Sequence, residues 1–173
     1  MKTAVVFFSY QGNTRRIAHE VASELGADAI ELVPRRRRRS TSERLEFVWA
    51  GVRVQMPALP EITHPDLKLD DYDLLIIATP VWAGTIAPPL RSFLESHEFF
   101  RKQFGLLVTY AGRVGATLEH MREHVLGNEI LGELSLRDEL HGDGSSLCLQ
   151  ARAWARDIAT DAAAQDRQEA SGE

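Results

Sequence analysis

The chain has very little cysteine and no long apolar segment. Cys148 is the only cysteine among 173 residues, so the chain cannot form an internal disulfide. No stretch approaches the roughly 18 consecutive apolar residues of a membrane span. The run from Ala4 to Phe8 is too short for a signal-peptide core, and no small-residue cleavage site follows it. We therefore expect a cytoplasmic protein without a membrane span.

An excess of positive charge is also missing. The net charge is −5, which gives no general attraction for nucleic acid or for an anionic membrane. Hydrophobic residues make up 44% of the chain, which is typical of a globular rather than a disordered protein. The length suits a single domain over residues 1–165, and we expect residues 166–173 to be a disordered tail because they are small and polar.

Short apolar runs alternate with amphipathic segments along the chain. Five apolar runs are expected to be strands: 3–8, 29–33, 74–78, 104–109 and 130–136. The first four have the continuous apolar character of buried strands, whereas the last alternates between apolar and polar residues like an edge strand. Helices are expected after the loops, with the last from Leu147 to about Gln165. This alternation predicts an α/β fold of three layers, a five-stranded parallel sheet in order 2-1-3-4-5 with helices on both faces.

Three polar loops follow the first, third and fourth of these long buried runs, at 9–14, 79–87 and 109–115. In the predicted strand order the three loops are neighbours at the carboxyl edge of the sheet, where ligands of such folds bind. The first loop opens a helix, and its backbone N–H groups and the helix dipole suit an anion such as phosphate. The other two loops contribute Trp82 and Tyr110. The combination predicts a ligand with a phosphate and a flat ring system.

These residues resemble the flavodoxin-like family. Ser9-Tyr10-Gln11-Gly12-Asn13-Thr14 is similar to the family's flavin mononucleotide (FMN) phosphate loop, and residues 72–84 and 88–94 are similar to its third strand and first flavin loop. The resemblance implies FMN as cofactor and electron transfer as function. By position it implies phosphate binding by Ser9, Gln11, Gly12, Asn13 and Thr14, ring contacts from Thr79, Pro80, Val81, Trp82, Ala83 and Gly84, and cover of the other side of the ring from Tyr110, Gly112 and Gly115. It also suggests that a backbone carbonyl near Ala83 or Gly84 accepts a hydrogen bond from N5 of the reduced flavin.

Two functional classes follow from the resemblance. One is an oxidoreductase that takes hydride from NAD(P)H and reduces a quinone or similar small-molecule acceptor; the flavin does the chemistry there, so no catalytic side chain is assigned. The other is a one-electron carrier whose partner is another redox protein. Carrier flavodoxins are often strongly acidic around the flavin edge, whereas Arg113 stands in the third loop here. A homodimer, with Phe47, Val48 and Trp49 at its interface, stays open.

Three other features have simpler explanations. The run Arg35–Arg39 is expected to be a solvated loop. Two functional alternatives remain for it. The arginines could dock an acidic protein, in which case the domain would be an interaction module without flavin, or they could bind the 2′-phosphate of a nucleotide. His120 to His124 matches the zinc-protease pattern H-x-x-E-H, but we expect a solvated helix face away from the loops and no metal. Trp49 and Trp154 are expected to be core residues.

Overall fold

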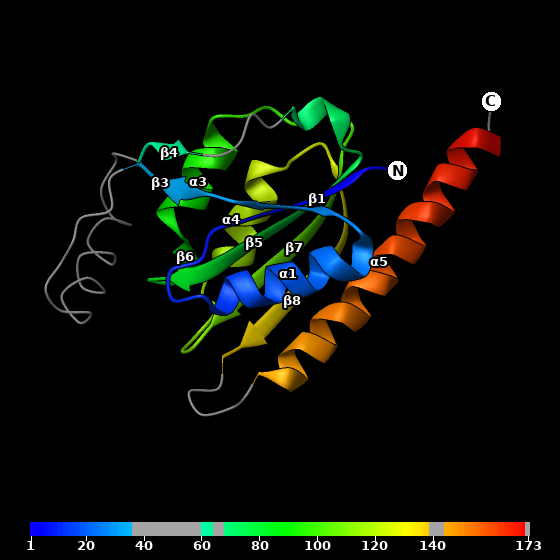
Figure 1. Cartoon of the computed structure of the whole chain (residues 1–173). Helices are drawn as coiled ribbons and strands as arrows, with labels where there is room; N and C mark the ends of the chain where they lie inside the picture. The colour runs from blue at the N-terminus through cyan, green and yellow to red at the C-terminus, as the bar shows by residue number, and fades with distance from the viewer. Residues whose placement is uncertain (36–59, 64–67, 139–143, 172–173) are drawn as a thin grey trace, which may run out of the picture.

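The structure is a computed structural model that describes residues 1–35, 60–63, 68–138 and 144–171 (Figure 1). Its main sheet contains five parallel strands in the order β2-β1-β5-β7-β8. These strands are β1 (Thr3–Phe7), β2 (Asp28–Glu31), β5 (Leu74–Trp82), β7 (Gln103–Tyr110) and β8 (Glu129–Arg137). In chain order this is 2-1-3-4-5, so the predicted α/β topology is confirmed.

Helices cover both faces of the sheet. Helix α1 (Asn13–Leu25) and helix α5 (Ser145–Ser171) lie on one face, and α3 (Pro88–Glu95) and α4 (Thr117–His124) lie on the other (Figure 1). Helices α1 and α5 are also joined by the ion pairs Arg152–Glu20 and Arg156–Glu24. These pairs are largely exposed, so the packing of apolar faces holds the two helices against the sheet. Within the described residues, no helix is both long and apolar enough to span a membrane.

The core consists of two apolar layers, one on each face of the sheet. Along β1, Val5 and Phe7 pack toward α1 and α5, while Ala4 and Val6 pack toward α3 and α4. Strand β5 follows the same alternation. Because both faces of these strands are buried, the strands read as continuous apolar runs in the sequence.

Short elements were not foreseen between the second and third long strands. Strand β2 ends at Glu31, and Val33–Pro34 forms β3, which pairs in antiparallel fashion with β4 (Ile62–Thr63). The 3-10 turn η1 (Leu69–Asp71) precedes β5. Pro34 was expected to end a strand over 29–33 and instead takes part in β3, at an edge position where a residue without an N–H is tolerated.

The last helix is longer than expected. Helix α5 continues to Ser171, so the backbone of residues 166–171 is helical rather than a frayed tail. The reason is local, since alanine, glutamine, arginine and glutamate dominate this segment and are good helix formers. Small and polar composition was therefore the wrong criterion for the end of the helix.

Two expectations lie wholly or mostly outside the described residues. Phe47, Val48 and Trp49, which were considered for a homodimer interface, are not described, and neither are Arg36–Arg39. Arg35 is described, and it forms an exposed ion pair with Glu61 at 3.3 Å while its N–H donates to the Glu61 carbonyl.

A buried tyrosine gives the fold a pH dependence at high pH. The Tyr72 hydroxyl donates to Asp28 Oδ2 at 2.7 Å, and this hydrogen bond, with burial, raises the tyrosine pKa from 10.0 to about 12. The folded-state pKa is raised, so the stabilisation is complete below pH 10.0 and is lost as the pH rises through about 12. We expect the free energy of unfolding of the wild type to fall across this window relative to that of Tyr72→Phe, as measured by urea denaturation. Parallel curves for the two proteins would contradict the assignment.

Candidate functional site

Three loops meet at the carboxyl edge of the sheet, where β1, β5 and β7 end. These strands are adjacent in the sheet, so the predicted meeting of the loops is confirmed. The residues of the expected site lie in these loops or in the adjoining ends of α1, β5 and β7: Ser9, Gln11, Gly12, Asn13, Thr14, Thr79, Pro80, Val81, Trp82, Ala83, Gly84, Tyr110, Gly112 and Gly115.

The first loop leads from β1 into helix α1. Gly12, the residue before the helix, has φ 103°, which glycine adopts at little cost. The N–H groups in the first turn of any α-helix have no hydrogen-bond partner within the helix. No side-chain cap supplies one here. The Ser9 hydroxyl accepts the Gly12 N–H at 3.1 Å and holds the loop closed. The result is a tight turn with backbone donors at a positive helix end.

The arginine next to this loop is already paired. Two of the three guanidinium nitrogens of Arg15, Nε and Nη2, donate to the Glu31 carboxylate at 2.9 and 2.6 Å, and this contact raises the Arg15 pKa above its ordinary value. Glu31 lies at the end of β2. These two nitrogens of the guanidinium are therefore directed to β2 rather than to the loop.

Two further contacts tie the start of α1 to the far strands. The buried hydroxyls of Thr14 and Thr109 are 2.8 Å apart, and Asn13 Nδ2 donates to Asp138 Oδ2. The Thr14 hydroxyl, which was expected to bind phosphate, thus already has a partner. Thr109 and Asp138 were not assigned to the site in advance, because their contacts join residues 95 and 125 positions apart.

The second loop is a hairpin, which was not foreseen. The end of β5 pairs with β6 (Thr85–Ile86), with Val81 opposite Ile86 and Trp82 opposite Thr85. The two turn residues, Ala83 and Gly84, have φ values of 50° and 76°. Positive φ at both positions is typical of a type I′ turn. Thr79 supports the hairpin from within, since its buried hydroxyl accepts the Ala87 N–H at 3.3 Å.

Aromatic side chains connect the first loop to the hairpin. The Trp82 ring packs edge-on against Phe8 and Tyr10, with centroid distances of 5.5 and 5.4 Å. Phe8 is buried, whereas Tyr10 and Trp82 are half-buried. Such edge-to-face pairs hold the partly exposed indole in one orientation. Trp82 therefore lies beside the first loop, with part of its ring exposed.

The third loop touches the tip of the hairpin. The Ala116 N–H donates to the Gly84 carbonyl at 2.9 Å, and a Cβ on Gly115 would lie 2.4 Å from that same oxygen. Gly115 has φ 60°, so both conformation and space require glycine here. The Gly84 carbonyl, one of two suggested acceptors for N5 of a flavin, thus already accepts a hydrogen bond from Ala116, the residue before α4. Tyr110 is half-buried, and its carbonyl accepts the Asp138 N–H at 2.7 Å; Gly112 is exposed.

The histidine pair on α4 differs from the expected solvated face. His120 Nδ1 lies 2.6 Å from the Thr85 hydroxyl, so the helix contacts the second loop rather than lying away from it. His124 is half-buried, and this burial lowers its pKa. Among the described residues, no group of three or more His, Cys, Asp or Glu side chains is arranged to hold a metal ion.

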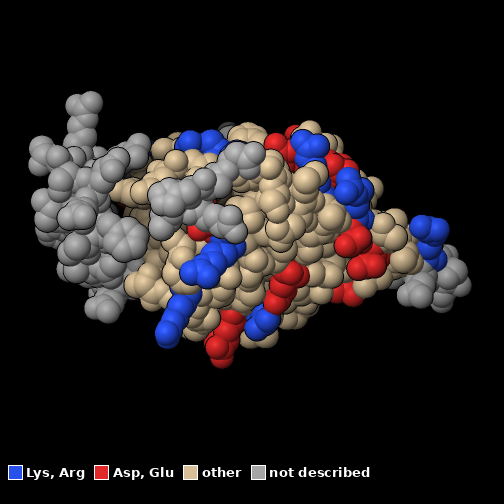
Figure 2. All heavy atoms as spheres, turned by 90° about the horizontal axis from the view of Figure 1, so that it is seen from below, with Lys and Arg blue, Asp and Glu red and all other residues tan. Residues whose placement is uncertain are grey.

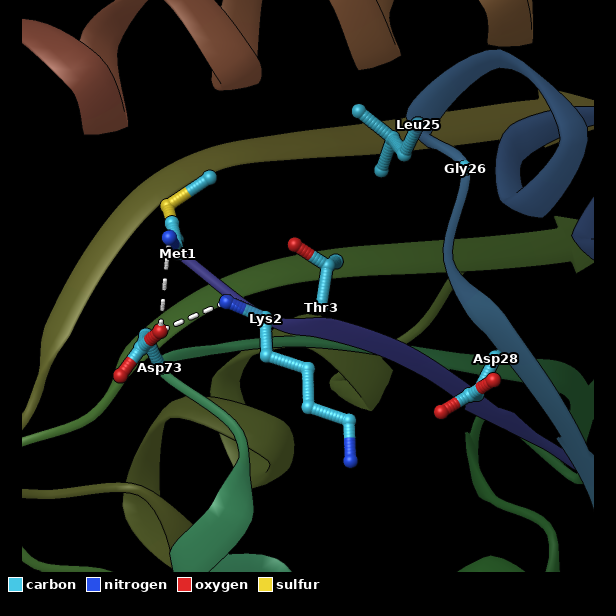
Figure 3. A pocket seen from close by; sticks show the side chains of 7 residues that line it. All are labelled: Met1, Lys2, Thr3, Leu25, Gly26, Asp28 and Asp73. Atoms are coloured by element: carbon cyan, nitrogen blue, oxygen red, sulfur yellow. Dashed lines mark hydrogen bonds and ion pairs between the residues drawn. The ribbon is translucent and has the colours of Figure 1, made fainter.

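The described residues on the face that Figure 2 shows carry charges of both signs. Seen from below, positive and negative side chains are interspersed, and neither sign gathers in one broad patch (Figure 2). A pocket of about 490 Å³ is lined by Met1, Lys2, Thr3, Leu25, Gly26, Asp28 and Asp73 (Figure 3). It lies at the amino ends of β1, β2 and β5, at the opposite edge from the three loops. The Asp73 carboxylate in this pocket accepts a hydrogen bond from the Lys2 N–H at 2.6 Å and forms an ion pair with the N-terminal amine at 3.9 Å.

The fold and the loops define a three-layer α/β protein with a tight turn at the start of α1 and the half-buried Trp82 beside it, both at the carboxyl edge of the sheet. The family model described as Flavodoxin matches residues 2–130, and the chain belongs to this family.

Solved structures share the fold. One is a flavoprotein from Lactobacillus acidophilus NCFM in complex with FMN, with 24% identity over 84% of this chain and 95% of that chain and a TM-score of 0.68. Another is a candidate flavoprotein from Bacteroides uniformis, with 20% identity over 90% and 97% of the chains and a TM-score of 0.74. A third is a flavodoxin from the domain Archaea, with 18% identity over 92% and 97% of the chains and a TM-score of 0.60. No curated protein matches the chain in sequence.

Proposed function

We propose that this protein binds FMN at the three loops and acts as an oxidoreductase that uses NAD(P)H to reduce a quinone or similar small acceptor. The observation that carries the FMN assignment is the uncapped start of α1 beside the Trp82 wall. The flavodoxin family and the FMN complex of the Lactobacillus acidophilus neighbour support it.

The residues fit both halves of the cofactor. The turn at Ser9–Thr14 carries no charged side chain, so the backbone N–H groups and the helix dipole supply the attraction for the phosphate dianion. Trp82 and Tyr110, both half-buried at neighbouring loops, suit a flat ring that is partly apolar and partly exposed. When bound, FMN would supply the hydride and electron transfer chemistry. The chain's own residues bind, orient and shield it.

The charges at the loops favour an enzyme over a protein-to-protein carrier. Residues 9–14, 79–87 and 109–115 contain no acidic side chain, and their single charge is the exposed Arg113. Arg113 on the third loop suits an anionic dinucleotide donor. Asp138, beside Asn13 and Tyr110, is an acidic group at the same edge, but the three loops themselves lack the acidic residues by which carrier flavodoxins meet their partners. A one-electron carrier remains the alternative, and it makes a different prediction for the isolated protein.

The first test is an absorption spectrum of the purified protein after incubation with FMN and removal of free ligand. We expect flavin bands near ~370 and ~450 nm to remain with the protein. We expect them to be lost in Trp82→Ala, which removes the aromatic wall, while a surface control, Arg167→Ala on α5, retains them. Loss of bound flavin from the wild type under saturating FMN would overturn the FMN assignment.

The second test separates the two redox classes. We expect the FMN-loaded protein to oxidise NADPH when a small quinone is supplied, with no other protein present. Arg113→Gln should raise the KM for NADPH more than it lowers kcat, because the arginine would act on binding of the anionic donor. Absence of turnover with either NADH or NADPH, despite bound FMN, would instead favour the carrier.

A further inference from the structure

We propose that His120 is a positioning residue for the flavin ring: its contact with Thr85 holds the β5–β6 hairpin, and through it Trp82, in the ring-binding orientation. The inference rests on the proposed function, since it concerns the same three loops. It assigns a role to a side chain on helix α4 that belongs to none of them.

The hairpin is too small to hold its own geometry. Strand β6 has two residues, and the turn contains Ala83 at φ 50°, a conformation that costs a residue with a Cβ about 1–2 kcal/mol. Isolated two-stranded hairpins are marginally stable even when longer. Beyond Thr79 and the aromatic packing of Trp82, this strained turn therefore needs support at its tip, and two contacts among the described residues supply it.

Both supports come from α4 and the residue before it. The Ala116 N–H binds the Gly84 carbonyl at 2.9 Å, and His120 Nδ1 lies 2.6 Å from Thr85 Oγ1. Residues 116 and 120 are one helical turn apart, and the His120 N–H donates to the Ala116 carbonyl. The first turn of α4 and the residue before it thus contact the hairpin twice, through the Ala116 backbone N–H and through the His120 side chain.

The side-chain contact is directly linked to the ring wall. Thr85 is the residue opposite Trp82 in the hairpin. Fixing Thr85 therefore fixes the backbone that carries the indole, whereas the phosphate turn at 9–14 is held by separate contacts of Ser9, Asn13 and Thr14. Loss of the His120 contact should weaken binding of the ring and leave binding of the phosphate intact.

The two halves of the cofactor can be measured separately, because riboflavin has the ring and lacks the phosphate. We expect His120→Leu and Thr85→Val each to weaken binding of FMN and of riboflavin by the same factor, roughly three- to tenfold for one hydrogen bond. The double variant should bind no worse than either single one, since both remove the same contact. His120→Asn, whose side-chain amide can replace Nδ1, should restore binding. Flavin fluorescence titration gives the dissociation constants.

Two readouts separate positioning from general loss of structure. The midpoint potential of bound FMN should move toward that of free FMN in His120→Leu and return in His120→Asn. His124→Leu, a half-buried histidine on the same helix, is the matched control and should leave both affinities and the potential unchanged. If His120→Leu does not fold, the same affinities and potential are measured for Thr85→Val, which is a near-isosteric change.

Unequal effects on FMN and riboflavin, additive effects of the two variants, or no effect at all would overturn the role of His120. A wild type that binds neither flavin would overturn the proposed function itself. A wild type that binds both, with His120→Leu unchanged, would leave the proposed function standing and remove only the positioning residue.

Discussion

Replacing Gly115 by alanine is expected to separate the hairpin from helix α4 and to lower both stability and flavin affinity. The new Cβ would lie 2.4 Å from the Gly84 oxygen and 2.5 Å from the Gly84 Cα. Both are backbone atoms, so no side-chain rotation can relieve the contact, and the turn at Ala83–Gly84 must shift. The hydrogen bond from the Ala116 N–H to the Gly84 carbonyl is then lost as well.

Two other glycines allow the contributions to be separated. Gly26 has φ 60°, the same as Gly115, but no atom lies within 4 Å of its added Cβ, so Gly26→Ala measures conformational strain alone, about 1–2 kcal/mol. Gly112 lies in the same loop with no such φ and no close atom, so Gly112→Ala should have little effect.

We expect the free energy of unfolding, from urea denaturation of the flavin-free protein, to decrease most for Gly115→Ala, less for Gly26→Ala and least for Gly112→Ala. Gly115→Ala, unlike Gly26→Ala, should also weaken riboflavin binding, by about tenfold or more for a displaced ring wall. Equal stability losses for Gly115→Ala and Gly26→Ala would show that the close contact between Gly115 and Gly84 adds nothing to the loss beyond conformational strain.

The architecture was predictable from the sequence because it depends on local patterns. Buried parallel strands appear as continuous apolar runs, and Val21 or Phe93 identifies the inner face of its helix by spacing alone; both are buried. The polar loops could be placed at one edge because parallel strands share a direction.

The internal supports of the site were not predictable, since they depend on tertiary contacts. Ala83-Gly84 is a weak hairpin signal compared with Asn-Gly or Asp-Gly, because alanine disfavours positive φ. The contact from His120 to Thr85 spans 35 residues, and nothing in the local sequence of either residue indicates it. The H-x-x-E-H pattern includes His120, but it is typical of zinc binding and does not indicate a contact with Thr85.

A glycine in the core is expected to be as sensitive as the one at the site. Gly105 in β7 lies opposite Gly132 in β8, and the two glycines leave space beneath Trp154 of α5. A Cβ on Gly105 would lie 2.5 Å from Ile76 Cδ1 and 2.8 Å from Ile158 Cδ1, both within the buried layer between the sheet and α5. The absence of a side chain at Gly105 thus sets how closely α5 packs on the sheet.

Gly105→Ala is therefore expected to destabilise the fold. Overpacking of this kind costs about 1–3 kcal/mol, which exceeds the roughly 0.5–1 kcal/mol gained by replacing glycine in a strand. The cost should be smaller for Gly132→Ala, whose nearest atoms would lie 3.1–3.4 Å away. Urea denaturation of the flavin-free protein measures both changes.

A double variant identifies the cause of the loss at Gly105. Ile76→Val removes Cδ1, the atom closest to the new methyl group, and costs about 0.5–1.5 kcal/mol alone because it leaves a small cavity. In Gly105→Ala/Ile76→Val the methyl group of alanine fills that cavity, so the double variant should lose less stability than the sum of the two single losses. Additive losses would mean that the backbone of β7, rather than its contact with Ile76, requires glycine at this position.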